Sequence, residues 1–324
     1  MSVAGLNHAF GIAGALVFEE RPEGLTEARL ASAHGNAAVC LQGGHVIDWR
    51  CQGQKEPVLW LSPDARFAEG KSIRGGIPVC WPWFGPYGTT PPPREHALQR
   101  SVAAGAVPRA GAENFPAHGF ARTAAWQVAD SDVAADGSVR LGLMLDAEAM
   151  PAAMWPHATE LRLEIRLGAS LQLELRTRNI GASACVLGEA LHTYFNISDI
   201  GAVSVGGLHG VEYWDTVGQV ALKRQSGPIT FDRETDRVYI DSPQACVIED
   251  PGYARRIHVR KQGSLSTVVW NPWTAKAERM GDLGQPEGWR QMLCVESANA
   301  WDNTITLAPG ETHALSVSYE VEPL

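Results

Sequence analysis

The sequence predicts an all-β protein, built as a large antiparallel β-sandwich. Several segments alternate apolar and polar residues with a period of two, whereas sustained 3.6-residue periodicity is hard to find. The chain also contains 33 glycines and 20 prolines, a combined share above the ~12% of an average protein. Such a composition predicts many turns and few long helices.

The alternation is clearest in four segments, residues 139–146, 160–167, 171–175 and 315–321. Strict alternation turns one face of a strand toward the core and the other toward water, which is typical of antiparallel sheets. Gly168-Ala169-Ser170 separates the second segment from the third, so we expect a β-hairpin there.

The length of 324 residues would by itself suggest about two domains. We predict instead a single sandwich domain over residues 1–324, with a Pro/Ala-rich inserted loop at about 88–114. That loop contains Pro91-Pro92-Pro93 and few large apolar residues, so it cannot form a strand of a central sheet. A flexible excursion and a lid over a nearby site are both open interpretations.

Charge and composition exclude several classes of protein. The formal net charge is -9 and no basic run occurs, which argues against a nucleic-acid partner. No apolar run approaches the ~20 residues needed to span a bilayer, and no basic residue precedes the short apolar stretch 9–18, so neither a membrane span nor a signal peptide is expected. The six cysteines are scattered singly, as reduced thiols would be. We therefore predict a soluble, cytoplasmic protein.

Several catalytic motifs are missing from the sequence. It contains no GxGxxG after a strand, no GxxxxGK[ST] and no GxSxG, so nucleotide-binding folds and serine hydrolases are not supported. The histidines form no HxH, HExxH or HxxxH set, and a catalytic metal is not expected.

Two loop-like clusters could bind a ligand. In residues 71–86, Arg74 precedes a glycine pair and three large aromatic residues; arginine suits a phosphate or carboxylate, and tryptophan suits the faces of sugars. A core corner with Arg74 in a structural ion pair is the alternative. The second cluster, residues 116–122, contains His118, which can change protonation near neutral pH. A purely structural histidine is the alternative. Arg122 could join Arg74 as a second anion clamp.

Two strand-like clusters could carry catalysis. If residues 191–197 form a strand, His192, Tyr194 and Asn196 share one face, which suits the floor of a pocket. Glu296 follows a short apolar run, and a buried carboxylate has a shifted pKa. A lone histidine and a lone buried glutamate are a pair that can divide the acid and base roles. The cluster at residues 234–239 reads more simply as a surface ion pair.

Six motifs, in this order, resemble the glucose-6-phosphate 1-epimerases of the aldose 1-epimerase superfamily: SIRGGIPVCWPWFGP, PAHGFAR, LHTYFN, ETDRVY, VVWNP and CVESA. The resemblance covers the chain from about Ala37 onward. It implies a β-supersandwich of the galactose mutarotase type, in agreement with the period-two pattern. It also implies an isomerase that interconverts the α and β anomers of a hexose 6-phosphate, without a cofactor or a metal.

Residue roles follow from the resemblance. His192 matches the catalytic acid of the family and Glu296 its catalytic base. Arg74 and Arg122 match substrate-binding arginines, with the phosphate as their expected partner.

The resemblance also assigns two further pocket residues. Asp236 matches a residue that holds sugar hydroxyls, and His118 a histidine near the ring that assists catalysis. Relatives often carry glutamine at the position of Ala117, so a side-chain contact from that position is lost here. A mutarotase for unphosphorylated sugars and a non-catalytic sugar-phosphate-binding sandwich remain alternatives. We expect a monomer.

Overall fold

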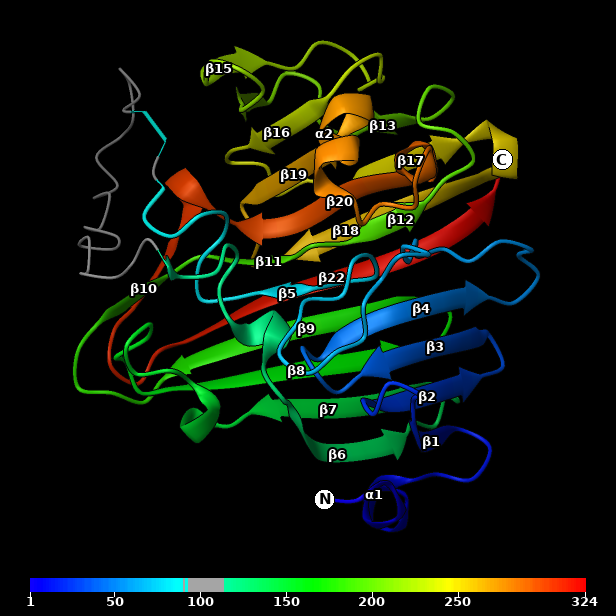
Figure 1. The fold of residues 1–324 in the computed structure, drawn as a ribbon, viewed down its shortest axis with the longest axis vertical. Coiled ribbons are helices and arrows are strands. Elements are labelled where there is room, and N and C mark those ends of the chain that lie inside the picture. Colours follow the sequence, from blue (N-terminus) through cyan, green and yellow to red (C-terminus); the bar gives the residue numbers. More distant parts are fainter. Residues whose placement is uncertain (90, 93–113) are drawn as a thin grey trace.

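The computed structural model describes residues 1–89, 91–92 and 114–324, whose strands form four antiparallel sheets (Figure 1). The back sheet has eight strands in the order β13-β17-β18-β22-β9-β8-β7-β6. Its strands are β6 (Gln127–Val133), β7 (Val139–Leu145), β8 (Thr159–Leu167), β9 (Leu171–Asn179), β13 (Ser204–Gly206), β17 (Cys246–Asp250), β18 (Arg255–Gln262) and β22 (Thr312–Pro323).

A second eight-stranded sheet, here called the site sheet, has the order β15-β14-β16-β19-β20-β11-β5, with β12 also paired to β20. Its strands are β5 (Val79–Cys80), β11 (Glu189–Leu191), β12 (Tyr194–Asn196), β14 (Glu212–Asp215), β15 (Ala221–Arg224), β16 (Thr235–Tyr239), β19 (Ser266–Asn271) and β20 (Met292–Asn299).

The remaining elements are a four-stranded sheet, a two-stranded sheet and short helices. The four-stranded sheet contains β1 (Leu16–Glu20), β2 (Thr26–Ser32), β3 (Gly35–Cys40) and β4 (His45–Cys51), and the two-stranded sheet contains β10 (Cys185–Leu187) and β21 (Ile305–Leu307). The two α-helices of the described chain are α1 (Val3–Phe10) and α2 (Trp273–Met280). None of its helices is long and apolar enough to cross a membrane.

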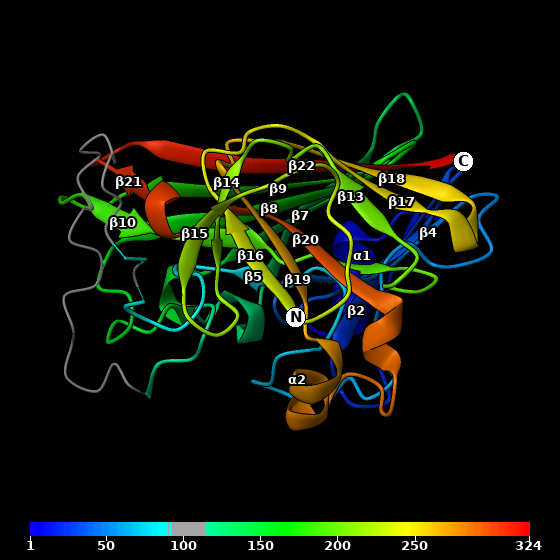
Figure 2. The ribbon, with the colours of Figure 1, turned by 90° about the horizontal axis from the view of Figure 1, so that it is seen from above.

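The sheets stack as a sandwich. Figure 2 shows the back sheet as one layer, with the four-stranded sheet and the site sheet on the same side of it. The four-stranded sheet packs on β7 and β8, while β20 packs on β22. One continuous apolar core contains side chains from all three of these sheets. The all-β sandwich predicted from the alternation is therefore confirmed.

The predicted strands of the back sheet are also confirmed. In β8, Leu161, Leu163, Ile165 and Leu167 are fully buried, and the residues between them are partly exposed. Burying one such aliphatic side chain contributes about 1.5–3 kcal/mol to folding. Leu167 pairs with Leu171 across the predicted turn, so the alternating pattern sets both the strands and their register.

Strand β20 follows another rule, because all eight of its residues are buried. It lies between β19 on one side and β11 and β12 on the other. Val295 belongs to the main core, whereas Val268 on β19, which pairs with Glu296, belongs to a separate apolar cluster. A strand covered on both faces reads as a continuous apolar run, so the single glutamate in it is conspicuous.

The expectation of one strand over residues 191–197 is only partly right. Strand β11 ends at Leu191 and β12 begins at Tyr194. Between them, the N–H of His192 donates to Pro78 O at 3.0 Å and the N–H of Thr193 donates to Leu191 O at 3.0 Å. The backbone pairing with β20 is thus interrupted at His192, the candidate catalytic residue. Most of the predicted 88–114 loop lies outside the described residues.

Arg255 ties these segments together from within the core. It is fully buried, and its guanidinium donates to Asn196 O at 2.6 Å and to Pro57 O at 3.1 Å. We expect Arg255→Met to lower the free energy of unfolding by about 3 kcal/mol, because the buried carbonyl of Asn196 loses the donor that Arg255 supplies, while Pro57 O keeps one from Asn196 Nδ2. Urea denaturation measures this. The control Arg256→Met removes a half-exposed ion pair to Glu249 and should lower stability by less than about 1 kcal/mol. Equal losses in the two variants would refute the assigned role.

Candidate active site

One face of the site sheet forms the floor of a cavity of about 760 Å³. Three neighbouring strands supply this face: β16 with Asp236 and Val238, β19 with Val268 and Trp270, and β20 with Glu296. These residues share one face because Asp236 pairs with Trp270, Val238 with Val268, and Val268 with Glu296. The opposite face carries the main core. Phe84, Tyr194, Trp270 and Trp301 supply aromatic walls.

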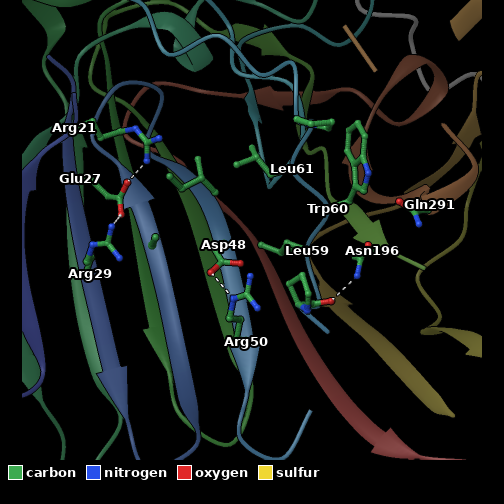
Figure 3. A pocket seen from close by; sticks show the side chains of 14 residues that line it. Arg21, Glu27, Arg29, Asp48, Arg50, Leu59, Trp60, Leu61, Asn196 and Gln291 are labelled. Carbon is green, nitrogen blue, oxygen red and sulfur yellow. Dashed lines mark hydrogen bonds and ion pairs between the residues drawn. The ribbon is translucent and has the colours of Figure 1, made fainter. Parts of the chain in front are cut away.

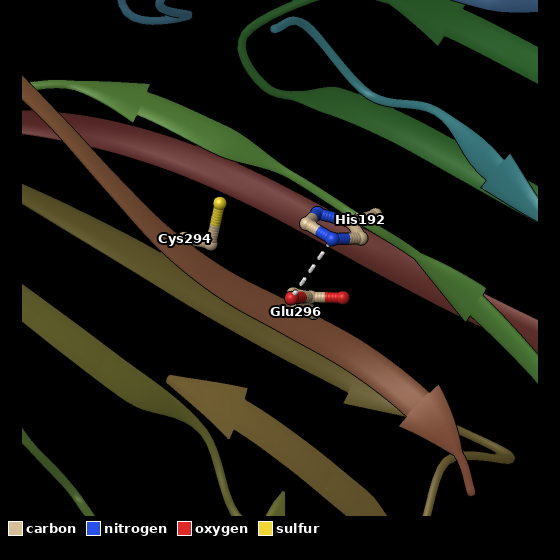
Figure 4. Close-up of side chains that lie close together, drawn as sticks. All are labelled: His192, Cys294 and Glu296. Atoms are coloured by element: carbon tan, nitrogen blue, oxygen red, sulfur yellow. Dashed lines mark ion pairs between the residues drawn. The ribbon is translucent and has the colours of Figure 1, made fainter. Parts of the chain in front are cut away.

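His192 and Glu296 meet at the centre of this floor. The pairing of Leu191 with Ser297 brings the end of β11 beside β20, and His192 Nε2 lies 3.4 Å from Glu296 Oε1 (Figure 4). Burial lowers the pKa of His192 well below 6.5, and repulsion from His118 and two arginines acts in the same direction. Burial raises the pKa of Glu296 well above 4.5, and the charge of Asp236 adds to this. Both shifts disfavour a separated ion pair, so the two groups favour a state in which they hold one proton between them.

The ring of His192 is held in place by aromatic contacts. It stacks on the ring of Tyr194 at a centroid distance of 4.9 Å and an interplanar angle of 10°. The hydroxyl of Tyr194 accepts a hydrogen bond of 2.9 Å from Arg74 Nη1. A residue from the first ligand-binding cluster and one from the first catalytic cluster are therefore joined directly.

His118 also lies in the cavity wall, 5.4 Å from His192 between ring centroids. Burial lowers its pKa to about 3, and repulsion from Arg122 and Arg74 contributes. The N–H of Gly85 donates to its Nδ1 at 3.3 Å, so the neutral ring carries its proton on Nε2 and can donate from there. The following Gly119 is required: its φ is +72°, and a Cβ would lie 1.9 Å from Trp81 O.

Arg122 differs from the expectation. It is not among the residues that line the cavity. Its Nη2 donates to Ala117 O at 2.6 Å, and its buried Nε has no hydrogen-bond partner among the described residues. The charge of Arg122 lowers the pKa values of His118 and His192, and its part as a second phosphate clamp beside Arg74 stays a prediction.

Asp236 lines the cavity, with partners that the sequence did not indicate. Lys276 on α2 lines the cavity, with its Nζ 3.3 Å from Asp236 Oδ2 and 3.0 Å from Glu234 Oε1. Burial raises the pKa of Asp236, and the charge of Lys276 opposes this. The surface-pair interpretation of residues 234–239 is therefore wrong for Asp236. Nothing in the spacing of WTAKAERM pointed to Lys276.

Three side chains at the floor could in principle hold a metal ion. His192, Cys294 and Glu296 offer ligand atoms that all lie within 4.8 Å of one another (Figure 4). Burial raises the pKa of the Cys294 thiol well above 9.0, and the charge of Glu296 adds to this. A protonated thiol is a poor metal ligand, so the donor set does not fit a resident metal well. A metal-free site stays a prediction.

Asn196 does not share the cavity with His192. It lines a second cavity of about 440 Å³, together with Trp60 and side chains of the four-stranded sheet (Figure 3). The arginines there are already paired: Arg21 with Glu27 at 2.5 Å, and Arg50 with Asp48 at 3.1 Å. The expected three-residue face is thus divided between two cavities, with His192 and Tyr194 in the first and Asn196 in the second.

A buried carboxyl–imidazole pair at the floor of an aromatic cavity, on an antiparallel β-sandwich, is suited to an enzyme that uses general acid–base catalysis. The sequence contains no motif for a covalently attached cofactor. The family model described as aldose 1-epimerase matches residues 28–320, and the chain belongs to this family. It is accordingly an epimerase, as the sequence predicted.

Individual relatives agree with this assignment. A protein of Escherichia coli K12 named "Putative glucose-6-phosphate 1-epimerase" is 37% identical over 82% of this chain and 80% of its own length. One of the same name from Cenchrus ciliaris is 35% identical over 90% and 83%. The crystal structure of a protein from Salmonella typhimurium, described as a "putative mutarotase", superposes with a TM-score of 0.81 at 29% identity, covering 97% of this chain and 96% of that one.

The buried carboxyl makes a prediction about stability. Because the pKa of Glu296 is raised in the folded state, ionising it destabilises the fold as pH rises above about 4.5, the value in the unfolded chain. We expect Glu296→Gln to unfold with at least about 1 kcal/mol more free energy than the original chain at pH 8, and with a smaller gain at pH 5. Denaturation at the two pH values measures this. The exposed Glu278→Gln serves as control, and an equal gain at both pH values would count against the shifted pKa.

Proposed function

We propose that this chain interconverts the α and β anomers of hexose 6-phosphates by opening and reclosing the sugar ring. The contact between His192 and Glu296 carries this proposal, since it joins one acid and one base at the floor of a sugar-sized cavity. The names of the relatives in Escherichia coli and Cenchrus ciliaris support the phosphorylated substrate.

The reaction follows from where the proton sits. The reaction uses the form of the pair with Glu296 ionised and His192 protonated, which carries the same single proton as the neutral form that burial favours. In this form, Glu296 removes the proton from the C1 hydroxyl while His192 donates one to the ring oxygen. The bond between C1 and the ring oxygen breaks and C1 becomes an aldehyde. Rotation about C1–C2 turns the other face of the carbonyl toward the ring oxygen, and the two proton transfers then run in reverse. Each turnover restores the protonation state of the pair, and no electron is transferred.

The other site residues have supporting roles in this proposal. His118 donates from Nε2 to an oxygen near the anomeric centre, and Asp236 accepts hydrogen bonds from ring hydroxyls. The aromatic walls pack on the apolar faces of the sugar. Arg74 and Lys276 are the Arg and Lys side chains among the described lining residues. We assign the 6-phosphate to Arg74, while the positive charge of Arg122 contributes through its electrostatic field. The single-domain organisation, the monomeric state and the cytoplasmic location stay predictions from the sequence.

The catalytic pair is tested by removing each group in turn. Glu296→Gln and His192→Asn should each slow anomer exchange on glucose 6-phosphate by about 10²–10⁴-fold, the usual contribution of a general acid or base. Exchange NMR measures the rate, and glucose-6-phosphate dehydrogenase coupling gives an independent reading. Glu278→Gln should leave the rate unchanged. Full activity in Glu296→Gln would exclude it as the base, and no acceleration by the original chain would exclude the proposed function.

The phosphate assignment separates this proposal from a mutarotase for neutral sugars. Arg74→Ala should raise KM for glucose 6-phosphate roughly tenfold or more, because it removes a charged hydrogen-bond donor. It should leave KM for free glucose within about twofold. Steady-state kinetics give KM for both sugars with the original chain and with Arg74→Ala. An equal change in KM for the two sugars would favour the neutral-sugar alternative. Sugar-phosphate binding without turnover would favour a non-catalytic sandwich.

A further inference from the structure

Arg74, the residue to which we assign the phosphate, is anchored on two sides. Its Nη1 donates to Tyr194 Oη at 2.9 Å, and its Nε donates to Asp282 Oδ2 at 3.1 Å. Its Nη2 makes no hydrogen bond to any described residue. These two hydrogen bonds fix the orientation of the planar guanidinium, so its remaining N–H groups point in a fixed direction. The side chain lines the cavity and is 24% exposed.

Asp282 is itself held rigidly. It follows α2, and its carbonyl oxygen accepts a hydrogen bond of 2.8 Å from Ser62 Oγ. Two residues later, the N–H of Gly284 donates to Asp64 Oδ2 at 2.9 Å. The backbone that carries the carboxylate is therefore fixed by contacts at and after Asp282 that do not involve Arg74.

The second oxygen of that carboxylate is unusual. Asp282 Oδ1 is buried and has no hydrogen-bond partner among the described residues. A buried acceptor left unpaired is unfavourable for folding, so a role confined to stability does not explain it. The carboxylate lies beside the guanidinium of Arg74, and no other described side chain donates to it. Any anion that approaches Arg74 meets the charge of this carboxylate as well as that of the arginine.

We propose that Asp282 is a specificity-determining positioning residue, which orients Arg74 toward the phosphate of the substrate and, through its own charge, limits how tightly that phosphate is held. The inference rests on the proposed function and deepens it. The carboxylate acts in two separable ways. As a hydrogen-bond acceptor on Nε, it fixes the guanidinium. As an anion, it weakens the binding of another anion to the same group, with an effect that salt reduces.

Two substitutions separate the two roles. Asp282→Asn keeps an oxygen that can accept from Arg74 Nε but removes the charge. We expect it to lower KM for glucose 6-phosphate roughly threefold or more, a change of the size that one partly exposed charge produces. Its kcat should stay within about twofold, and its KM should rise more steeply with salt. Asp282→Ala removes the acceptor as well, so its KM should lie at least about threefold above that of Asp282→Asn.

The controls make the outcome decisive. KM for free glucose should change by less than about twofold in both variants, and Glu278→Gln, which removes an exposed carboxylate from α2, should match the original chain on both sugars. If the original chain does not act on glucose 6-phosphate, the proposed function and this inference both fail. If it does act, and Asp282→Asn binds the phosphorylated sugar no more tightly than the original chain, only this inference fails. Equal KM values for the Asn and Ala variants would overturn the orienting role, and thermal unfolding confirms that each variant is folded.

Discussion

The burial of an ionisable pair at the centre of the molecule is the constraint on which the rest of the structure depends. Glu296 is 1% exposed on a strand whose eight residues are all buried, and His192 lies at the adjoining break in the ladder. Such a carboxyl is tolerated because it can share a proton with the imidazole and because one face of the sheet opens into a cavity. The same burial that is unfavourable for stability lowers the pKa of His192 and raises that of Glu296, so the pair holds one proton and the charged form that the proposed reaction uses arises by transfer of that proton within the pair.

Charge compensation is the second principle of the site. Arg74 is matched by Asp282, and Lys276 by Asp236 and Glu234, so the cations of the wall are neutralised before any ligand arrives. A cavity wall arranged in this way is selective through geometry and hydrogen bonding more than through its net charge. It is compatible with a chain whose overall charge is -9 and which we propose acts on an anionic sugar.

Much of the fold could be predicted from the sequence, because it depends on local periodicity. The strands β7, β8, β9 and β22 appear where apolar residues alternate, and the hairpin forms at Gly168. Glu296 could be singled out as well, since a lone carboxyl in an apolar run must be buried and paired. The order of six short motifs was enough to indicate the aldose 1-epimerase family, which the family model confirms. Lys276 and Asp282 could not be found in this way, because nothing in their local sequence marks them.

The sequence by itself determined the class of fold, the family and the two residues that we propose carry the chemistry, because periodicity and residue type act over a few neighbouring positions. Only the tertiary structure decided which of these residues meet. It joined His192 to Glu296 through the pairing of β11 with β20, placed Asn196 in a second cavity, and left Arg122 out of the described lining of the first. The physical reason is that pairing between strands far apart in the chain sets these distances, and no pattern of neighbouring residues encodes that pairing.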